Sequence, residues 1–307
     1  MHSHDPPPGS GAHLRLHLDE CRFTHASPFR ALVRETALRV GLEPRALAVR
    51  VLLHLPRVAT CSGLVTRWDV QRELRVSAQG LAADAQAASA YMPIEKFPLR
   101  ELTFETIDPN LGLRVLASLH YLRSARPGSL YFGLVDPVHR SPVSLCSISP
   151  LQWPCVSRAI HKRFGIAPER IWEVSRVYST NMAPRNSISA LLSGVRTYVR
   201  QNMPSIDLLV TAVDPNLGFT GSSYRAANWQ EWMTVRARPY LYKNGRYVSP
   251  RQLREQFGTS NFKELQARNA ERFQKSSVRL LDSMIFCSNV NQKTRVVPAQ
   301  DRQRLHR

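Results

Sequence analysis

Four consecutive segments alternate between strand and helix patterns, and this alternation constrains the fold more than any other feature. The runs IWEVSRVYS (171–179) and DLLVTAVD (207–214) are short and mostly apolar, as is typical of strands. Between them, residues 186–201 repeat apolar side chains at helical spacing, and SSYRAANW (222–229) begins a short helix. Strand, helix, strand and helix in succession predict an α/β fold with some parallel pairing.

The segments on either side extend this pattern. Residues 129–136 and 142–149 predict two strands of a hairpin across a polar turn, and 111–122 predicts an amphipathic helix. Residues 233–242 predict a last strand. We therefore expect an α/β domain at 98–260, with a mixed sheet flanked by helices.

The chain before this domain predicts a mainly helical region. Residues 28–54 repeat apolar side chains at helical spacing with a break at Gly41 and Pro44, which predicts two helices and a tight turn. In outline this pair resembles a helix-turn-helix, in which Arg45 and Arg50 would face a DNA groove. Helix pairs with arginines on their exposed side are also common, so the sequence leaves both interpretations open.

Composition divides the chain into four parts. Residues 1–20 are rich in Pro, Gly and His and predict a disordered leader. We expect a helical accessory region at 21–97, the catalytic domain at 98–260, and a basic helical extension ending in a tail at 261–307.

The charge of the chain favours a polyanionic partner. Lys and Arg number 42 against 23 Asp and Glu, a formal net charge of +19 that is spread along the sequence. Nucleic acid is the first candidate and an anionic membrane surface the second. Because no apolar run approaches the roughly 20 residues of a membrane span, no secretion signal is evident and the five cysteines form no C-x-x-C pair, we expect a cytoplasmic protein without structural zinc.

The stretch LLVTAVDPNLGFTGSSYRAANW (208–229) contains the first candidate site residues. Asp214 ends a strand, which would place its carboxylate at the sheet edge where α/β folds bind ligands. The glycines at 218 and 221 permit backbone conformations that other residues disfavour, before a helix that carries Tyr224. The alternative is an ordinary connection, in which Asp214 makes turn hydrogen bonds and Tyr224 packs with its hydroxyl satisfied; residue types alone favour it.

The preceding strand and helix add charged and hydroxyl side chains. Glu173 and Arg176 lie in a run otherwise fit for burial, where a charge needs a partner. Arg185 then precedes a helix whose N-terminal amides would favour a phosphate, with Ser187 or Ser189 as a further donor. This order of elements resembles the core of GNAT acyltransferases, in which coenzyme A lies between two splayed strands.

Three stretches resemble the Mom family of phage DNA-modification proteins. They are SLHYLRSARPGSLYFGLVDP (118–137), EVSRVY (173–178) followed by APRNS (183–187), and DPNLGFTGSSYRAANW (214–229). The resemblance covers roughly residues 100–260. It implies a GNAT-like fold and the transfer of a methylcarbamoyl group to the exocyclic amine of adenine in DNA.

The resemblance also implies the site residues. The catalytic set would be Arg176, Ser189, Asp214 and Tyr224, supported by His120 and Tyr121. Acetyl-coenzyme A would be the cofactor, bound by Arg185, Asn186, Ser187 and Asn228. The usual GNAT pyrophosphate loop is glycine-rich, whereas the only glycine of the corresponding segment here is the late Gly194. Iron bound by His120 and Asp214 is one suggestion, but a lone His is more often a packed residue, so we assign no metal ligand.

The expected function is therefore a DNA-modifying acyl-type transferase that protects phage DNA from restriction in the cytoplasm of the host. Its partners would be double-stranded DNA and a small-molecule acyl donor. A catalytically inactive GNAT-like DNA-binding or regulatory protein, or a GNAT N-acetyltransferase acting on another amine, are the alternatives. The sequence leaves the oligomeric state open. The candidate phosphate contacts are Arg34, Arg39, Arg45, Arg50, Arg236, Arg238, Arg246, Arg251 and Arg254.

Overall fold

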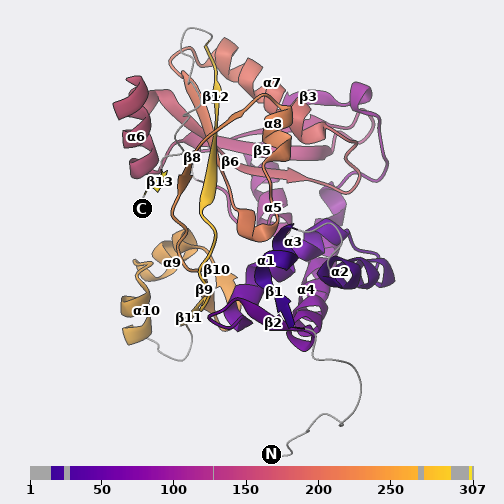
Figure 1. Cartoon of the computed structure of the whole chain (residues 1–307). Helices are drawn as coiled ribbons and strands as arrows, with labels where there is room; N and C mark the ends of the chain where they lie inside the picture. The colour runs from indigo at the N-terminus through magenta and orange to yellow at the C-terminus, as the bar shows by residue number, and fades with distance from the viewer. Residues whose placement is uncertain (1–14, 24–27, 127, 269–272, 292–303, 306–307) are drawn as a thin grey trace, which may run out of the picture. The chain divides into compact units, whose positions relative to one another are not determined.

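The computed structural model divides the chain into two compact units (Figure 1). Unit 1 consists of Met1–Ala78 and Pro239–Arg279, and unit 2 consists of Gln79–Arg238 and Leu280–Arg307. This division differs from the boundaries expected near residues 98 and 260, because the C-terminal part of the chain contributes to both units. The structure describes all residues except 1–14, 24–27, 127, 269–272, 292–303 and 306–307.

Among the described residues, unit 2 is built on an eight-stranded sheet in the order β13-β8-β12-β7-β6-β5-β4-β3. The described pairs β6–β7 and β13–β8 are parallel and the remaining described neighbours are antiparallel. This mixed sheet confirms the predicted α/β fold. The strands are β3 (Thr103–Thr106), β4 (Leu130–Val135), β5 (Pro142–Pro150), β6 (Ile171–Ser179), β7 (Leu208–Val213), β8 (Gln230–Val235), β12 (Ser283–Asn289) and β13 (Arg304–Leu305).

Helices cover both faces of this sheet, as predicted. Side chains of neighbouring residues on a strand point to opposite faces, and Leu209 packs in the core cluster of α7 and α8, whereas Leu208 packs in that of α6. Likewise Phe132 packs with α7, whereas Tyr131 packs with α5. The central strand β7 is therefore buried on both faces, which explains its nearly continuous apolar sequence. The helices are α5 (Pro109–Leu119), α6 (Pro154–Phe164), α7 (Ser187–Asn202) and α8 (Ser222–Ala226).

One strand prediction was wrong. The run 233–242 is not a single last strand, because β8 ends at Val235 and the next strand, β9 (Leu241–Lys243), belongs to unit 1. The predicted helical extension instead contains β12, which pairs with both β7 and β8 in the interior of the sheet. Its sequence SMIFCSN is short and partly apolar, so its central position depends on pairing with strands far away in the sequence.

Unit 1 contains the two helices and the tight turn predicted within residues 28–54, and a groove-facing role of Arg45 and Arg50 stays a prediction. Gly41, with φ of +67°, lies in the turn, and the Glu43 carboxylate caps the second helix through the amides of Arg45 and Ala46. The elements that begin in this unit are β1 (Arg15–His17), α1 (Leu18–Phe23), α2 (Pro28–Arg39), α3 (Pro44–Val58), β2 (Leu64–Thr66), α4 (Arg67–Ala88), β9, β10 (Arg246–Val248), α9 (Pro250–Phe257), α10 (Phe262–Arg268) and β11 (Phe273–Lys275).

The two sequence segments of unit 1 are joined through buried side chains. Tyr242 on β9 is fully buried, and its hydroxyl donates to the carbonyl of Leu53 on α3 at 3.0 Å. The Ser277 hydroxyl donates to the carbonyl of Ala59. Residues 239–279 therefore complete the N-terminal region rather than the α/β domain. None of the helices in the described residues is long and apolar enough to cross a membrane.

Candidate functional site

The sheet opens between β6 and β7. These parallel strands pair only over residues 171–173 and 208–210, although β6 continues to Ser179. Where pairing stops, the buried Thr211 hydroxyl donates to the carbonyl of Val174 at 2.9 Å. The divergence agrees with the splayed strands that the GNAT resemblance implies, and it lies toward the carboxyl ends of the strands, where α/β sheets bind ligands.

Tyr224 lies on α8 beside this divergence. Its ring centroid is 5.5 Å from that of Trp229 and 5.6 Å from that of Phe286, and its hydroxyl is 3.4 Å from the Thr211 Oγ1. Burial raises the pKa of Tyr224 to about 12, so the phenol keeps its proton at neutral pH. Gly221, with φ of +76°, precedes the helix, and a Cβ there would overlap the Phe286 ring. Glycine at this position therefore fixes the approach of α8 to the sheet.

The start of α7 lies against the start of α8. The Ser189 hydroxyl donates to the carbonyl of Ser223 at 3.3 Å, next to Tyr224 in the sequence. The structure thus brings Ser189 and Tyr224 into neighbouring turns of two helices on the same face of the sheet.

The predicted phosphate cradle at the start of α7 has fewer side-chain donors than expected. Asn186 is the N-cap residue, with φ of +68° and an exposed side chain, and Arg185 is exposed beside it. The buried Ser187 hydroxyl donates to the carbonyl of Pro184 at 2.6 Å. Backbone amides of the first helical turn and Arg185 are therefore the groups best placed to receive an anion. Asn228, the remaining predicted cofactor contact, is exposed just after α8.

Gly194 has a packing role instead of a phosphate-binding one. It lies within α7, and a Cβ at this position would overlap the ring of Phe104 on β3. The absence of a side chain lets α7 approach the edge of the sheet closely. This explains why the single glycine of the segment comes late.

Asp214 follows β7 and is half-buried. Its Oδ1 accepts hydrogen bonds from the amide of Asn216 at 2.9 Å and from the Asn216 side chain at 2.7 Å. Through the first of these bonds Asp214 caps the short helix η4 (Pro215–Leu217). The buried Asn216 also exchanges two hydrogen bonds with the backbone of Leu281, at 2.9 and 2.8 Å. Asp214 therefore makes the turn hydrogen bonds that residue types favoured, and any chemical role is added to this one.

The pentapeptide DPNLG occurs a second time, with the same local capping. Asp108 accepts hydrogen bonds from the amides of Asn110 and Leu111, each at 3.0 Å, at the start of α5. Asp108 and Asp214 thus share a capping role, but only Asp214 ends a central strand. This pair offers a control for any experiment on Asp214.

His120 and Tyr121 follow α5 and reach the loop between Asp214 and Tyr224. Their rings stack with centroids 4.4 Å apart, and the Tyr121 ring is 5.8 Å from that of Phe219. The buried His120 accepts a hydrogen bond from the amide of Leu122 through Nδ1. The two predicted supporting residues are therefore packed together, and Tyr121 contacts the loop that joins Asp214 to Tyr224.

The buried charges of β6 meet partners, as expected. The Arg176 Nε donates to the carbonyl of Ser124 at 2.7 Å, and its Nη2 lies 3.2 Å from the Ser124 hydroxyl. Glu173 forms an ion pair with Arg126 at 2.7 Å. Together these contacts fasten the segment 120–126 onto β6, so the segment that carries His120 and Tyr121 is tied to the strand that carries Arg176.

A small hollow lies on the α6 side of the divergence. Its lining includes Glu173, Thr211 and Trp153. The space that it encloses is about 10 Å³, about enough for one water molecule, so it is not a pocket for a coenzyme, a base or an acyl group. The convergence of Arg176, Asp214 and Tyr224 on one cleft stays a prediction.

The structure adds three residues to the site that the sequence analysis did not single out. Thr211 links the Tyr224 hydroxyl to β6, Ser124 holds Arg176, and Phe219 contacts Tyr121. A threonine within the apolar run LLVTAV was a usable signal for the first. Ser124 and Phe219 lie in loops, and no local pattern distinguishes them.

Within the described residues, no three His, Cys, Asp or Glu side chains gather closely enough to hold a metal ion. His120 and Asp214 therefore have no third ligand of this kind in the described part of the chain. The five cysteines all lie in the described part of the chain, and none of them forms a disulfide.

Comparisons with known proteins give a family and several distant structures. The model of the Mom protein family matches residues 101–298. No curated protein matches the chain. The solved structures similar to this chain include the spermidine/spermine N-acetyltransferase SpeG from Vibrio cholerae. Its sequence identity to this chain is 9%, the match covers 62% of this chain and 94% of that one, and the TM-score is 0.36. A ribosomal-protein-S5-alanine acetyltransferase from Vibrio fischeri has 8% identity over 65% of this chain and 99% of that one, also at 0.36.

Proposed function

We propose a function from one premise: the chain belongs to the Mom protein family, whose model covers residues 101–298 and so all the candidate site residues. The function is acyl-type transfer to the exocyclic amine of adenine in DNA. The group transferred is methylcarbamoyl, and the product is a modified adenine. Such a modification would protect phage DNA from restriction. The order β6, α7, β7 and α8, with the divergence between the two strands, supports a GNAT-like transferase core.

The roles of the site residues follow from their chemistry. The adenine amine is a weak nucleophile because its lone pair is delocalised into the ring, so the site must hold it against the donor and remove a proton as the bond forms. Asp214 is the proposed proton acceptor. Tyr224, whose pKa of about 12 keeps it protonated, donates a hydrogen bond to the departing group. Arg176 stabilises negative charge that develops on the acyl oxygen.

The acyl donor is the less defined partner. Acetyl-coenzyme A fits two observations: the first-turn amides of α7 with the exposed Arg185 suit a diphosphate, and the strands β6 and β7 diverge next to that helix. A methylcarbamoyl group contains a nitrogen that an acetyl group lacks, so the reaction needs a further nitrogen source. We therefore derive no step beyond the attack of the amine on the donor.

The DNA substrate is supported by charge. Unit 1 has 20 Lys and Arg against 10 Asp and Glu in its 119 residues, and unit 2 has 22 against 13 in 188 residues. The excess is denser in unit 1, which contributes no strand to the eight-stranded sheet in the described residues. Because the adenine amine lies within the base pair, the target base must be flipped out, at a cost of about a few kcal/mol.

Mass spectrometry of nucleosides tests the proposal. DNA from cells that express the chain should contain a modified deoxyadenosine, which Asp214→Asn should abolish. Asparagine is an equally good cap, so this variant keeps the turn while it removes the proton acceptor. Asp108→Asn changes the matching residue of the other DPNLG and should leave the modification intact.

Other outcomes would assign the chain elsewhere. Unmodified DNA together with intact DNA binding would indicate an inactive DNA-binding protein. An acetylated amine outside DNA would indicate another GNAT activity. Equal loss of modification in both Asp→Asn variants would show that the effect is not specific to Asp214 and would contradict its role as the proton acceptor.

A further inference from the structure

An aromatic side chain stands exposed at the start of α4. Trp68 is 64% exposed, and Val76, two turns further along the same helix, is 60% exposed. Both residues belong to unit 1. Single exposed apolar residues are common, so the exposure alone does not indicate a function; the surroundings of Trp68 do.

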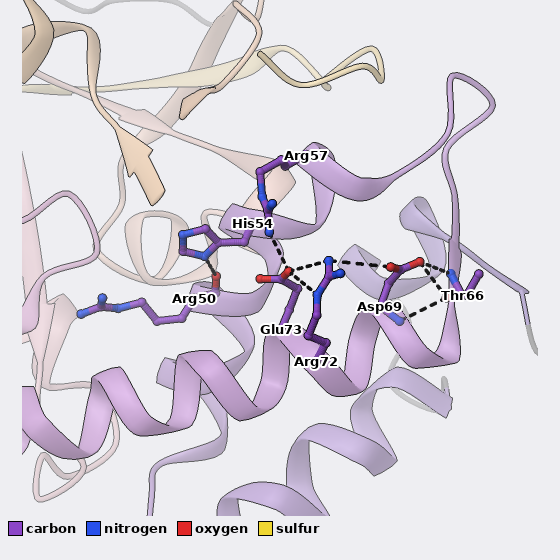
Figure 2. Close-up of polar contacts among 7 residues, drawn as sticks. All are labelled: Arg50, His54, Arg57, Thr66, Asp69, Arg72 and Glu73. Carbon is purple, nitrogen blue, oxygen red and sulfur yellow. Dashed lines mark hydrogen bonds and ion pairs between the residues drawn. The ribbon is translucent and has the colours of Figure 1, made fainter. Parts of the chain in front are cut away.

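The Trp68 ring is held against an arginine. The guanidinium carbon of Arg72 lies 4.8 Å from the ring centroid, a cation–π distance. Figure 2 shows how Arg72 is fixed: its Nη2 lies 3.1 Å from Glu73 and 3.8 Å from Asp69, and Glu73 also pairs with Arg57 at 2.8 Å. The pair of Trp68 and Arg72 is therefore preorganised.

The backbone beneath Trp68 is fixed as well. The Asp69 amide donates to the Thr66 hydroxyl at 3.1 Å, while the Thr66 amide donates to the Asp69 carboxylate at 3.1 Å (Figure 2). This reciprocal arrangement is a capping box, which stabilises the first turn of the helix. Trp68 lies within that turn, so its exposed ring projects from a rigid element.

The exposed charged side chains on the stretch of α4 that carries Trp68 are positive. Arg67 and Arg75 are exposed on the same stretch of helix, whereas Glu73 is buried and Asp69 is largely covered. In residues 67–80, all of which the structure describes, no acidic side chain is exposed. A flat aromatic surface between arginines is what proteins use to bind unpaired bases, because every base has a face to stack and flanking phosphates to pair.

We propose that Trp68 and Arg72 form a stacking platform for an unpaired DNA base, with Arg67 and Arg75 at the neighbouring phosphates. This inference rests on the proposed DNA substrate and adds a second contact, outside the transferase core, for DNA that has been opened. Bases inside an intact duplex are stacked on each other and do not offer a free face. The platform therefore distinguishes opened from closed DNA.

The test measures the affinity of the full chain for two labelled oligonucleotides by fluorescence anisotropy. One is a 20-base-pair duplex and the other is the same duplex with a single bulged nucleotide. Trp68→Ala should weaken binding of the bulged DNA about 5- to 160-fold, because the loss of one base stack has this effect. It should change the affinity for the closed duplex by no more than about twofold, and Trp68→Phe should retain most of the affinity for the bulged DNA.

Two matched variants separate stacking from other effects. Val76→Ala removes an equally exposed apolar side chain of α4 and should change neither affinity. Arg75→Ala should weaken both DNAs alike and reduce the slope of log affinity against log salt by roughly 0.9. Unchanged melting temperatures would show that all variants are folded.

Equal effects of Trp68→Ala on both DNAs, or no effect on either, would overturn the platform. The outcome is independent of catalysis, since it does not require that adenine be modified. If the wild type produced no modified deoxyadenosine, but Trp68→Ala still weakened binding of the bulged DNA alone, the proposed reaction would fail and the platform would stand. If modified deoxyadenosine were found, but Trp68→Ala did not weaken binding of the bulged DNA, the proposed reaction would stand and the platform would fail.

Discussion

The ion pair between Arg126 and Glu173 offers the sharpest test of how the site is held together. The two side chains are 10% and 7% exposed, and their charged atoms are 2.7 Å apart. Arg126→Met keeps the aliphatic bulk but removes the charge next to a buried carboxylate. Breaking a buried pair from one side costs about 3–5 kcal/mol, because the remaining charge stays desolvated.

For a unit of this size, such a loss lowers the melting temperature by roughly 6–20 °C. Calorimetry should show this shift in the transition of unit 2. The double variant Arg126→Met/Glu173→Gln should regain much of the loss, since no buried charge is then left alone. Hydrogen exchange should be faster in residues 120–126, which carry His120 and Tyr121, than in the wild type.

Arg170→Met provides the control. Arg170 pairs with Asp207 at the same 2.7 Å distance, but its side chain is 47% exposed. Solvent-exposed pairs contribute little, so this variant should leave the midpoint almost unchanged. If Arg126→Met behaved like Arg170→Met, or if the double variant recovered nothing, burial would not be what makes the Arg126 pair important.

Three further predictions concern the glycine before α8, the phenol of Tyr224 and the DNA surface. Gly221→Ala should lower the free energy of unfolding in urea more than Gly165→Ala does. Both glycines have a positive φ, which alone costs an alanine about 1–2 kcal/mol, but only the Cβ at position 221 would overlap another side chain, that of Phe286. Equal losses of stability in the two variants would contradict the close approach of Gly221 to the Phe286 ring. Folding raises the pKa of Tyr224 from its usual 10 to about 12, so the stability this proton provides is complete below pH 10 and is lost as pH rises toward 12. The stability of the wild type relative to Tyr224→Phe should therefore fall by about 1.3 kcal/mol between pH 9 and pH 11, and a constant difference would refute the burial argument. Finally, if six or more arginines contact phosphate, affinity for duplex DNA should fall about a thousandfold between 50 and 200 mM salt, whereas a flat dependence would count against a DNA substrate.

Local patterns were enough to find most elements near the site. The periodicity of residues 171–229 predicted β6, α7, β7 and α8, because each is short and its apolar spacing depends only on near neighbours. The buried charges of β6 also predicted that Glu173 and Arg176 meet partners, which they do. The identity of those partners, Arg126 and Ser124, depends on contacts about 50 positions apart in the sequence and could not be predicted from spacing.

The two copies of DPNLG show the limit of local information. Both aspartates cap the turn that follows, yet the first copy continues into α5 and the second stops at Gly218, with φ of +77°. In the first copy Gly112 is helical and lies so close to Tyr131 that a Cβ would overlap its ring. In the second, Asn216 is held by the backbone of Leu281. The same five residues therefore adopt different structures because different distant segments pack on them.

The sequence by itself determined the α/β alternation, the helix pair at the N-terminus, the basic charge and the identity of the candidate side chains, because these depend on residue type and short spacing. Only the tertiary structure decided that β12 enters the middle of the sheet and that residues 239–279 complete unit 1. It also decided that the Ser187 hydroxyl donates to a backbone carbonyl while Ser189 contacts the helix of Tyr224. Strand pairing and burial join residues far apart in the chain, and no local pattern carries that information.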